Sequence, residues 1–195
     1  MKSNLELETL DAHWLPAPKA VLRMVMLVGP PGVGKTTVAS YLARQCPFQN
    51  AMLDGDDLAM TNPGGTDRKR LDLIERNILH CAEGYRLWGA QYCFCSWIVA
   101  HQHRLDMLEK RMRAKGIHLR TIALDAPVNV LVDRMASRPQ ARFAPTESNL
   151  DYLNGLRKRI RGLAHCEILD TTGRHFTTVA SDAAALIKRP SFWEF

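Results

Sequence analysis

The sequence predicts an α/β domain in which a parallel β-sheet is covered by helices on both faces. Short apolar runs alternate with longer amphipathic segments along most of the chain, which is typical of parallel strands joined by crossover helices. In addition, Gly29-Pro30-Pro31-Gly32-Val33-Gly34-Lys35-Thr36 matches the phosphate-binding pattern G-x-x-x-x-G-K-[ST] between an apolar run and a helical segment. Ligands of such sheets bind at the carboxyl ends of the strands.

The individual elements follow from apolar runs and from helical periodicity. The first run, residues 21–28, leads into the phosphate-binding loop and is continuously apolar apart from Arg23, as in a buried strand. The segment 67–88 places Leu71, Ile74, Ile78, Leu79, Ala82 and Tyr85 on one helical face. The predicted strands are 21–28, 50–53, 91–97, 117–124 and 165–169, and the predicted helices are 35–45, 67–88, 101–115, 128–137, 147–162 and 176–188.

Length and composition indicate one compact domain. The chain has 195 residues, of which 46% are hydrophobic and 24% charged, as in ordinary soluble proteins. We expect residues 1–20 to be an N-terminal extension and residues 21–195 to be a single domain. No apolar run could span a bilayer, we expect no secretory leader because no charged-then-apolar segment stands at the start, and the five cysteines are scattered and odd in number. We therefore expect a cytoplasmic monomer or homodimer with no membrane association.

The phosphate-binding loop predicts a nucleoside triphosphate site, with ATP and Mg²⁺ as cofactors. Glycines let the backbone N–H groups turn inward around phosphate oxygens, and the following helix presents its positive end. Lys35 would reach the β- and γ-phosphates, and the Thr36 hydroxyl would ligate Mg²⁺. The expected nucleotide contacts here are Gly29, Pro31, Gly32, Val33, Gly34, Lys35, Thr36 and Thr37.

Three carboxylates follow the second predicted strand, in Asp54-Gly55-Asp56-Asp57-Leu58. Phosphoryl transfer to a hydroxyl needs Mg²⁺ and a carboxylate that orients the acceptor and takes its proton. Asp54 and Asp56 are two residues apart and would share a face of an extended segment. We expect Asp56 to be the base or acceptor anchor and Asp54 its partner on the Mg²⁺ side, although the reverse assignment stays open. Asp57 is a further acceptor-side candidate, and capping of the next segment is the alternative role of these acids.

Arginines around the fourth helix suggest a lid over the phosphates at about residues 138–150. Arg134 and Arg138 lie four positions apart on one helical face, Pro139 ends the helix, and Arg142 follows. Arginines on a closing segment cover γ-phosphate charge and exclude water. We expect Arg138 and Arg142 to act in catalysis, and Arg134 and Arg138 to contact the nucleotide.

The end of the third strand provides candidates for the acceptor side. Trp97 stands beside His101 and His103, which suggests an acceptor with a flat or apolar portion, or alternatively plain packing. The net charge is +6, with basic residues concentrated in 104–120 and 134–161. Such segments suit polyphosphate substrates and could also hold nucleic acid.

These motifs resemble the small P-loop kinases of metabolites and antibiotics, an AAA-type group that includes gluconate kinase, chloramphenicol phosphotransferase and adenylylsulfate kinase. Asp54-Gly55-Asp56-Asp57-Leu58 is similar to gluconate kinase's G-D-D-L and adenylylsulfate kinase's D-G-D. Phe94-Cys95-Ser96 with His103-Arg104 is similar to gluconate kinase's C-S-A-L-K…Y-R, and Arg142-Phe143-Ala144-Pro145 to its lid H-F-M-P.

The resemblance implies a nucleoside-monophosphate-kinase-like fold with five parallel strands ordered 2-3-1-4-5. It also implies that Arg138 lies near the adenine, that Thr171 and Thr172 line the base pocket, and that Arg104 contacts the acceptor. The chain departs from gluconate kinase where Trp97-Ile98-Val99 replaces A-L-K and Arg142 replaces the lid histidine. Gluconate is therefore not the expected acceptor.

The favoured function is ATP-dependent transfer of a phosphate to a hydroxyl group of a small molecule. The alternative is a 5′-hydroxyl nucleic-acid kinase or an RNA-processing P-loop ATPase that uses the basic helices. A non-catalytic nucleotide switch is a third class, although the N-K-x-D guanine motif is absent and the acids at 54–57 would then have no evident role.

Overall fold

The computed structural model describes residues 14–18, 20–62, 68–137 and 146–194. Within these residues, parallel strands form one sheet in the order β2-β3-β1-β4-β5. The α/β class and this strand order were predicted, and both are confirmed. The strands are β1 Leu22–Val28, β2 Asn50–Asp54, β3 Tyr92–Trp97, β4 Ile117–Asp125 and β5 Glu167–Asp170.

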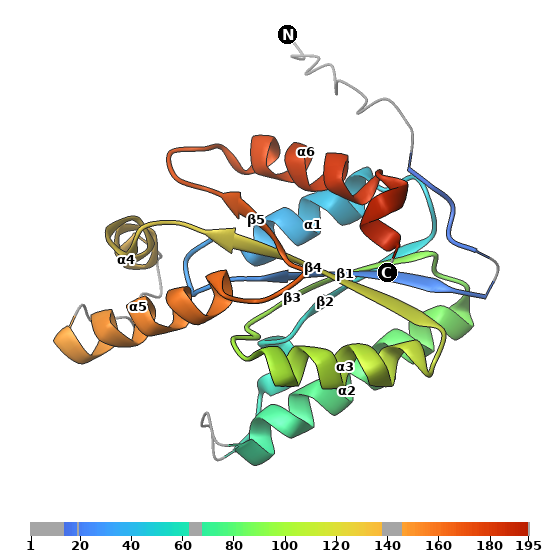
Figure 1. The fold of residues 1–195 in the computed structure, drawn as a ribbon, viewed down its shortest axis with the longest axis horizontal. Coiled ribbons are helices and arrows are strands. Elements are labelled where there is room, and N and C mark those ends of the chain that lie inside the picture. The colour runs from blue at the N-terminus through green and yellow to red at the C-terminus, as the bar shows by residue number, and fades with distance from the viewer. Residues whose placement is uncertain (1–13, 19, 63–67, 138–145, 195) are drawn as a thin grey trace, which may run out of the picture.

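Helices cover both faces of the sheet (Figure 1). α1 (Lys35–Gln45) and α6 (Phe176–Ile187) lie on one face, and α2 (Arg68–Trp88) and α3 (Gln102–Arg113) lie on the other. α4 (Val128–Ala136) and α5 (Glu147–Arg161) gather near the carboxyl ends of the strands. Two short 3₁₀ turns, η1 (Asp57–Ala59) and η2 (Pro190–Trp193), were not predicted.

The central strand β1 explains why the core has two halves. Met24, Met26 and Val28 face the layer of α2 and α3, whereas Val25 and Leu27 face the layer of α1 and α6. All five side chains are fully buried, because both faces of a parallel sheet are covered. The C-x-C pair of β3 follows the same alternation, and both Cys93 and Cys95 point into the first half of the core.

The described part of the N-terminal extension packs on the domain. Trp14 is 6% exposed, and its ring meets those of Tyr92 and Phe94 edge-on at centroid distances of 5.3 and 6.0 Å. The carbonyl of Leu15 accepts hydrogen bonds from Tyr92 Oη and from Arg23 Nη1, both at 2.7 Å. No helix in the described ranges combines the length and the apolar character needed to cross a bilayer.

Candidate active site at the carboxyl edge of the sheet

The phosphate-binding loop links β1 to α1, and two of its glycines stand where a side chain would be strained or would not fit. Gly34, directly before α1, has a φ of +100°, in the left-handed region that favours glycine. At Gly32 a Cβ would lie 2.9 Å from the Leu131 carbonyl oxygen, so the loop approaches α4 too closely for a side chain. Lys35 is only 9% exposed, and its Nζ donates a hydrogen bond to the carbonyl of Pro30 at 3.1 Å.

Three side-chain oxygens converge beside the loop, on α1, β2 and β3. Thr36 Oγ1 donates to Asp54 Oδ2 at 2.7 Å, and Ser96 Oγ donates to the same oxygen at 2.9 Å. The two hydroxyl oxygens are 3.3 Å apart. Hydroxyl and carboxylate oxygens are the ligands that Mg²⁺ prefers, so this donor set fits the ion expected at Thr36 and Asp54.

Ser96 was missed as a site residue in the sequence analysis. The feature that could have identified it is its position one residue before the carboxyl end of β3. In the register of β2 and β3, Ser96 pairs with Asp54. That pairing exists because β2 and β3 are neighbours in the sheet.

The interpretation that Asp54 and Asp56 share a face of an extended segment is wrong. β2 ends at Asp54, whose Oδ1 accepts a hydrogen bond from the backbone N–H of Asp56 at 2.9 Å. Asp56 itself has helical dihedrals at the start of η1. The turn separates the two carboxylates, so that Asp54 faces Thr36 and Ser96 while Asp56 lines a cavity. Asp57 is exposed in η1 and is absent from that lining.

The cavity beside Asp56, which we call the inner cavity, has a volume of about 310 Å³ and collects residues from four segments. Trp97 and Arg104, both predicted for the acceptor side, line it together with Asp56, and so does His101, which the sequence analysis placed beside Trp97. Its other walls come mainly from α2, α5 and the loop after β3, and no local sequence pattern indicated them. These walls are formed by Arg70, Leu71, Ile74, Glu75, Ile98, Val99, Ala100, Tyr152, Leu156 and Arg159.

The indole of Trp97 lies directly on the backbone of Gly55. A Cβ added at Gly55 would stand 2.2 Å from Trp97 Cδ1, a distance that no pair of non-bonded atoms tolerates. The glycine between the two catalytic candidates therefore serves packing, since it lets the end of β3 close against the turn after β2. One wall of the inner cavity depends on this contact.

An ion-pair network centred on Arg104 contributes Arg104 and Glu75 to the wall of the inner cavity. Arg104 Nε donates to Glu75 Oε1 at 2.8 Å, and Arg104 Nη2 donates to Asp72 Oδ1 at 2.9 Å. Glu75 is 5% exposed. Burial raises the pKa of the Glu75 carboxyl above its usual value, and the charge and hydrogen bond of Arg104 offset part of that rise.

Two residues predicted to contact the nucleotide, Arg134 and Thr171, are hydrogen-bonded to each other. Arg134 Nη1 donates to Thr171 Oγ1 at 2.9 Å, and Arg134 Nη2 donates to the Thr171 carbonyl at 2.6 Å. Thr171 is only 3% exposed, and its two bonds with Arg134 attach the loop after β5 to α4. Thr172 is half-buried and donates hydrogen bonds to Asp170. Arg138, Arg142 and the predicted lid up to residue 145 lie outside the described residues.

Asp125, at the end of β4, is a structural residue that the sequence analysis did not single out. It accepts two hydrogen bonds from Arg157, at 2.6 and 2.9 Å, and one from Arg161 at 2.6 Å. These bonds attach α5, which carries part of the inner-cavity wall, to the sheet.

The family model described as AAA domain matches residues 24–163, which include the phosphate-binding loop and the acidic turn. The chain belongs to the AAA domain family. This AAA domain has no match in sequence among curated proteins.

Solved structures share the fold of this AAA domain. A gluconokinase from Sinorhizobium meliloti 1021 is 18% identical with a TM-score of 0.66, over 88% of this chain and 97% of that one. The Mycobacterium tuberculosis APS kinase CysC, in complex with AMPPNP and APS, is 16% identical with a TM-score of 0.64, over 87% and 99%. A chain of the Pnkp1/Rnl/Hen1 RNA repair complex is 19% identical with a TM-score of 0.59, over 74% of this chain and 47% of that one. The predicted resemblance to small P-loop kinases is confirmed at the level of the fold.

Proposed function

We propose that this protein transfers the γ-phosphate of Mg·ATP to a hydroxyl group of a small molecule held in the inner cavity. The observation that carries the proposal is the meeting of three features at one edge of the sheet. These are the phosphate-binding loop with Lys35, the oxygen cluster around Asp54, and the Asp56 carboxylate on the cavity wall. The AAA domain family and the fold shared with P-loop kinases support the same class of reaction.

The residues divide the work as phosphoryl transfer requires. Lys35 would exchange its bond to the Pro30 carbonyl for phosphate oxygens, and Thr36 and Asp54 would hold Mg²⁺, which neutralises phosphate charge when bound. Asp56 would orient the acceptor hydroxyl and accept its proton as the new P–O bond forms and ADP leaves. The predicted lid arginines, Arg138 and Arg142, would cover the transferred phosphate.

The inner cavity favours an acceptor with a flat or apolar portion. Trp97, Ile98 and Tyr152 contribute apolar surface, while Asp56 stands ready for a hydroxyl. Arg104 forms ion pairs with Asp72 and Glu75, so in this structure it serves as part of the wall of the inner cavity.

The test is Mg·ATP turnover by the purified protein against a panel of hydroxyl acceptors: sugar acids, nucleosides, adenylylsulfate, antibiotics and a 5′-hydroxyl oligonucleotide. Asp56→Asn should lower transfer about 10²- to 10⁴-fold, the usual scale of general acid–base catalysis, with nearly normal ATP affinity. Asp57→Asn is the matched control and should retain activity, because Asp57 does not line the inner cavity. Unchanged transfer by Asp56→Asn would refute the role given to Asp56.

A 5′-hydroxyl nucleic-acid kinase is the second candidate. It is favoured by the cationic surface between α2 and α3 and by the fold shared with a chain of an RNA repair complex. Phosphate that appears only on the oligonucleotide, in an assay sensitive to salt, would make this candidate the correct one.

A further inference from the structure

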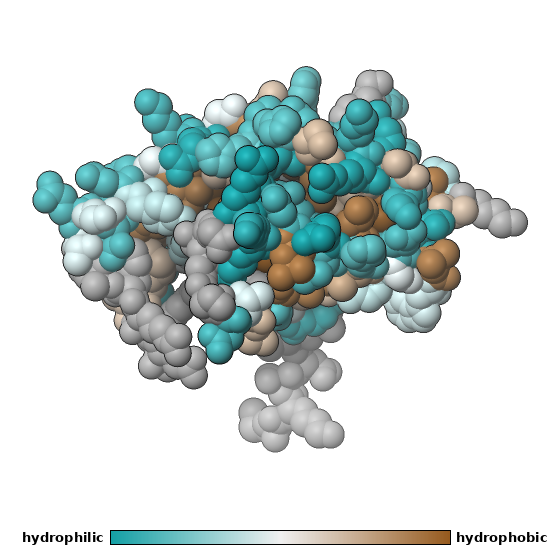
Figure 2. Space-filling model, turned by 90° about the horizontal axis from the view of Figure 1, so that it is seen from below, coloured by the Kyte–Doolittle hydropathy of each residue, from teal (hydrophilic) through white to brown (hydrophobic). Residues whose placement is uncertain are grey.

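A groove between α2 and α3 opens on the molecular surface next to the inner cavity. This outer groove has a volume of about 590 Å³. Figure 2 shows that the face over these two helices is mostly hydrophilic, with isolated hydrophobic side chains. One face of each helix lines the groove, through Arg68, Asp72, Glu75 and Arg76 on α2 and His103, Arg104, Met107 and Arg111 on α3.

The charges in the outer groove do not balance. Both of its carboxylates, Asp72 and Glu75, are ion-paired with Arg104. Among the described residues no carboxylate lies within ion-pair distance of Arg68, Arg76 or Arg111. The charge of Arg111 is nevertheless close enough to Glu75 to oppose the rise in the pKa of that carboxyl which burial causes. Three arginines on one concave surface repel one another, and a bound anion would relieve that repulsion.

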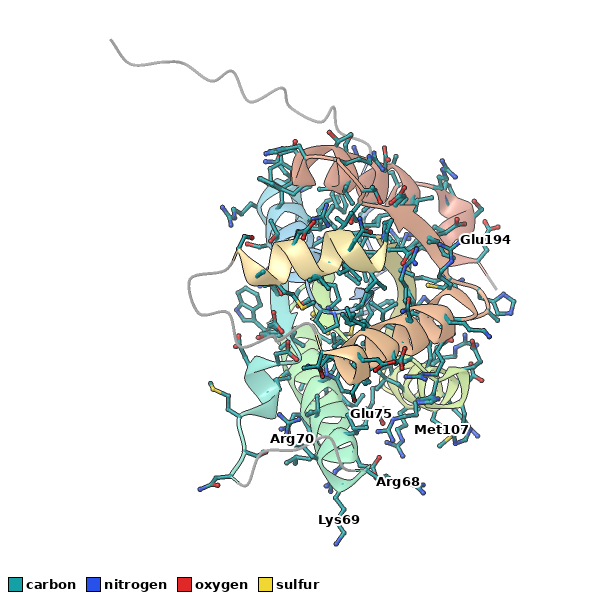
Figure 3. The ribbon with its side chains drawn as sticks, turned by 90° about the vertical axis from the view of Figure 1, so that its left-hand side faces the viewer. Arg68, Lys69, Arg70, Glu75, Met107 and Glu194 are labelled. Atoms are coloured by element: carbon teal, nitrogen blue, oxygen red, sulfur yellow. The ribbon has the colours of Figure 1, made fainter. Side chains whose placement is uncertain are left out.

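The start of α2 adds further positive charge beside the outer groove. Its first turn contains no acidic residue and begins with Arg68, Lys69 and Arg70, although a helix N-terminus carries positive partial charge and normally favours acids. Figure 3 shows Arg68 and Arg70 on opposite sides of this turn, with Met107 beyond the side of Arg68. Accordingly, Arg68 lines the outer groove and Arg70 lines the inner cavity.

The outer groove and the inner cavity adjoin, since Glu75 and Arg104, which form an ion pair, line both. The inner cavity is lined mainly by apolar residues, with Asp56, Arg70 and Arg159 among its charged ones. The outer groove adds Arg68, Arg76 and Arg111, and none of its lining residues is apolar except Met107. A molecule whose hydroxyl lies at Asp56 and whose apolar part fills the inner cavity would therefore place a further substituent near the arginines of the outer groove.

We propose that the outer groove is an anion subsite of the acceptor site, and that it holds a phosphate group which a small-molecule acceptor already carries. Phosphate suits the site because arginines bind its oxygens through paired N–H donors. This inference rests on the proposed function for the identity of the acceptor, while the subsite itself can be tested without turnover.

The direct test measures binding of inorganic phosphate, by calorimetry, with the nucleotide site saturated by Mg·ADP. The variants are Arg76→Ala/Arg111→Ala and the control Arg113→Ala, whose side chain on α3 pairs with Glu109. Loss of two charge-assisted contacts should weaken phosphate binding about 10- to 100-fold, and the control should bind as the parent does. Because Arg76 and Arg111 are exposed, the double variant should keep its far-UV spectrum. Parent-like phosphate binding by the double variant would overturn the subsite, whatever the kinase assay gives.

The kinetic test compares acceptors that differ only by a phosphate: ribose with ribose 5-phosphate, uridine with uridine 3′-phosphate, and glycerol with glycerol 3-phosphate. The phosphorylated member of a pair should be preferred, and Arg76→Ala/Arg111→Ala should raise its KM with little change in kcat. Equal use of both members of every productive pair would overturn the proposal. An effect of the variant on a 5′-hydroxyl oligonucleotide alone would assign the groove to nucleic-acid phosphate and overturn the small-molecule form.

Discussion

At the scale of single residues, the acidic turn after β2 shows how one backbone change assigns different chemistry to neighbouring carboxylates. The chain leaves the extended conformation at Asp54, so Asp54 meets Thr36 and Ser96 whereas Asp56 faces the inner cavity. Gly55, between them, makes room for the indole of Trp97. The proposed metal side and the proposed acceptor side thus adjoin within three residues.

Gly55→Ala should therefore damage acceptor binding more than nucleotide binding. The new Cβ would displace Trp97, which is 5% exposed and lines the inner cavity, and such overpacking costs about 1–3 kcal/mol of stability. We expect a raised acceptor KM with retained ATP affinity, measured by steady-state kinetics and urea unfolding. Gly84→Ala is the control, because a Cβ there meets nothing within 4 Å in α2 and should stabilise the helix by about 0.5–1 kcal/mol. The prediction fails if the two variants behave alike.

At the scale of elements, α5 connects the sheet to the inner cavity. Its Arg157 and Arg161 bind Asp125 at the end of β4, and its Tyr152 and Arg159 line the inner cavity. The Asp125 side chain is 7% exposed, so the bonds that it accepts are shielded from water. The position of one cavity wall is thereby tied to the carboxyl edge of the sheet.

Asp125→Ala should loosen this attachment. Loss of three charge-assisted hydrogen bonds to a buried carboxylate should cost about 2–3 kcal/mol of unfolding free energy and should raise the acceptor KM. Arg161→Ala should cost less, about 0–1 kcal/mol, because its side chain is 54% exposed and Arg157 keeps its two bonds. Urea unfolding of both variants measures the difference, and equal destabilisation would contradict the anchoring role of Asp125.

At the scale of the whole molecule, segments from both ends of the described chain close the opposite end of the sheet. The ring of Tyr92 lies 5.3 Å from that of Trp14 and 6.0 Å from that of Trp193. The guanidinium of Arg23 stands 4.9 Å from the Trp193 ring centroid, in cation–π range. This aromatic cluster lies at the end of the sheet opposite the carboxyl edge. Substitutions in it should therefore change stability more than catalysis.

Trp14 provides the test of that separation. Trp14→Ala should cost about 3–5 kcal/mol of unfolding free energy while leaving the KM for ATP unchanged under conditions where the protein stays folded. Trp14→Phe should cost much less, because the buried indole N–H has no hydrogen-bond partner among the described residues and its removal leaves no group unsatisfied. A Trp14→Phe variant as unstable as Trp14→Ala would show that shape rather than burial governs this contact.

Most of the fold could be predicted because its signals are local. Uninterrupted apolar runs and one-sided helical periodicity lie within single segments, and the predicted elements match the observed ones to within a few residues. The turn η1 escaped prediction because Asp54-Gly55-Asp56 was interpreted as extended, whereas a hydrogen bond from the Asp56 backbone to Asp54 Oδ1 accompanies the turn. Local propensity does not reveal that bond.

The sequence by itself determined the α/β class, the phosphate-binding loop and the group of carboxylates that follows β2, because each depends on residues adjacent in the chain. Only the tertiary structure decided that Ser96 joins Thr36 and Asp54, that Tyr152 and Glu75 line the cavity of Asp56, and that Arg104 takes both carboxylates of the outer groove. The physical reason is that these contacts depend on strand order and helix packing, which bring together side chains that are remote in the sequence.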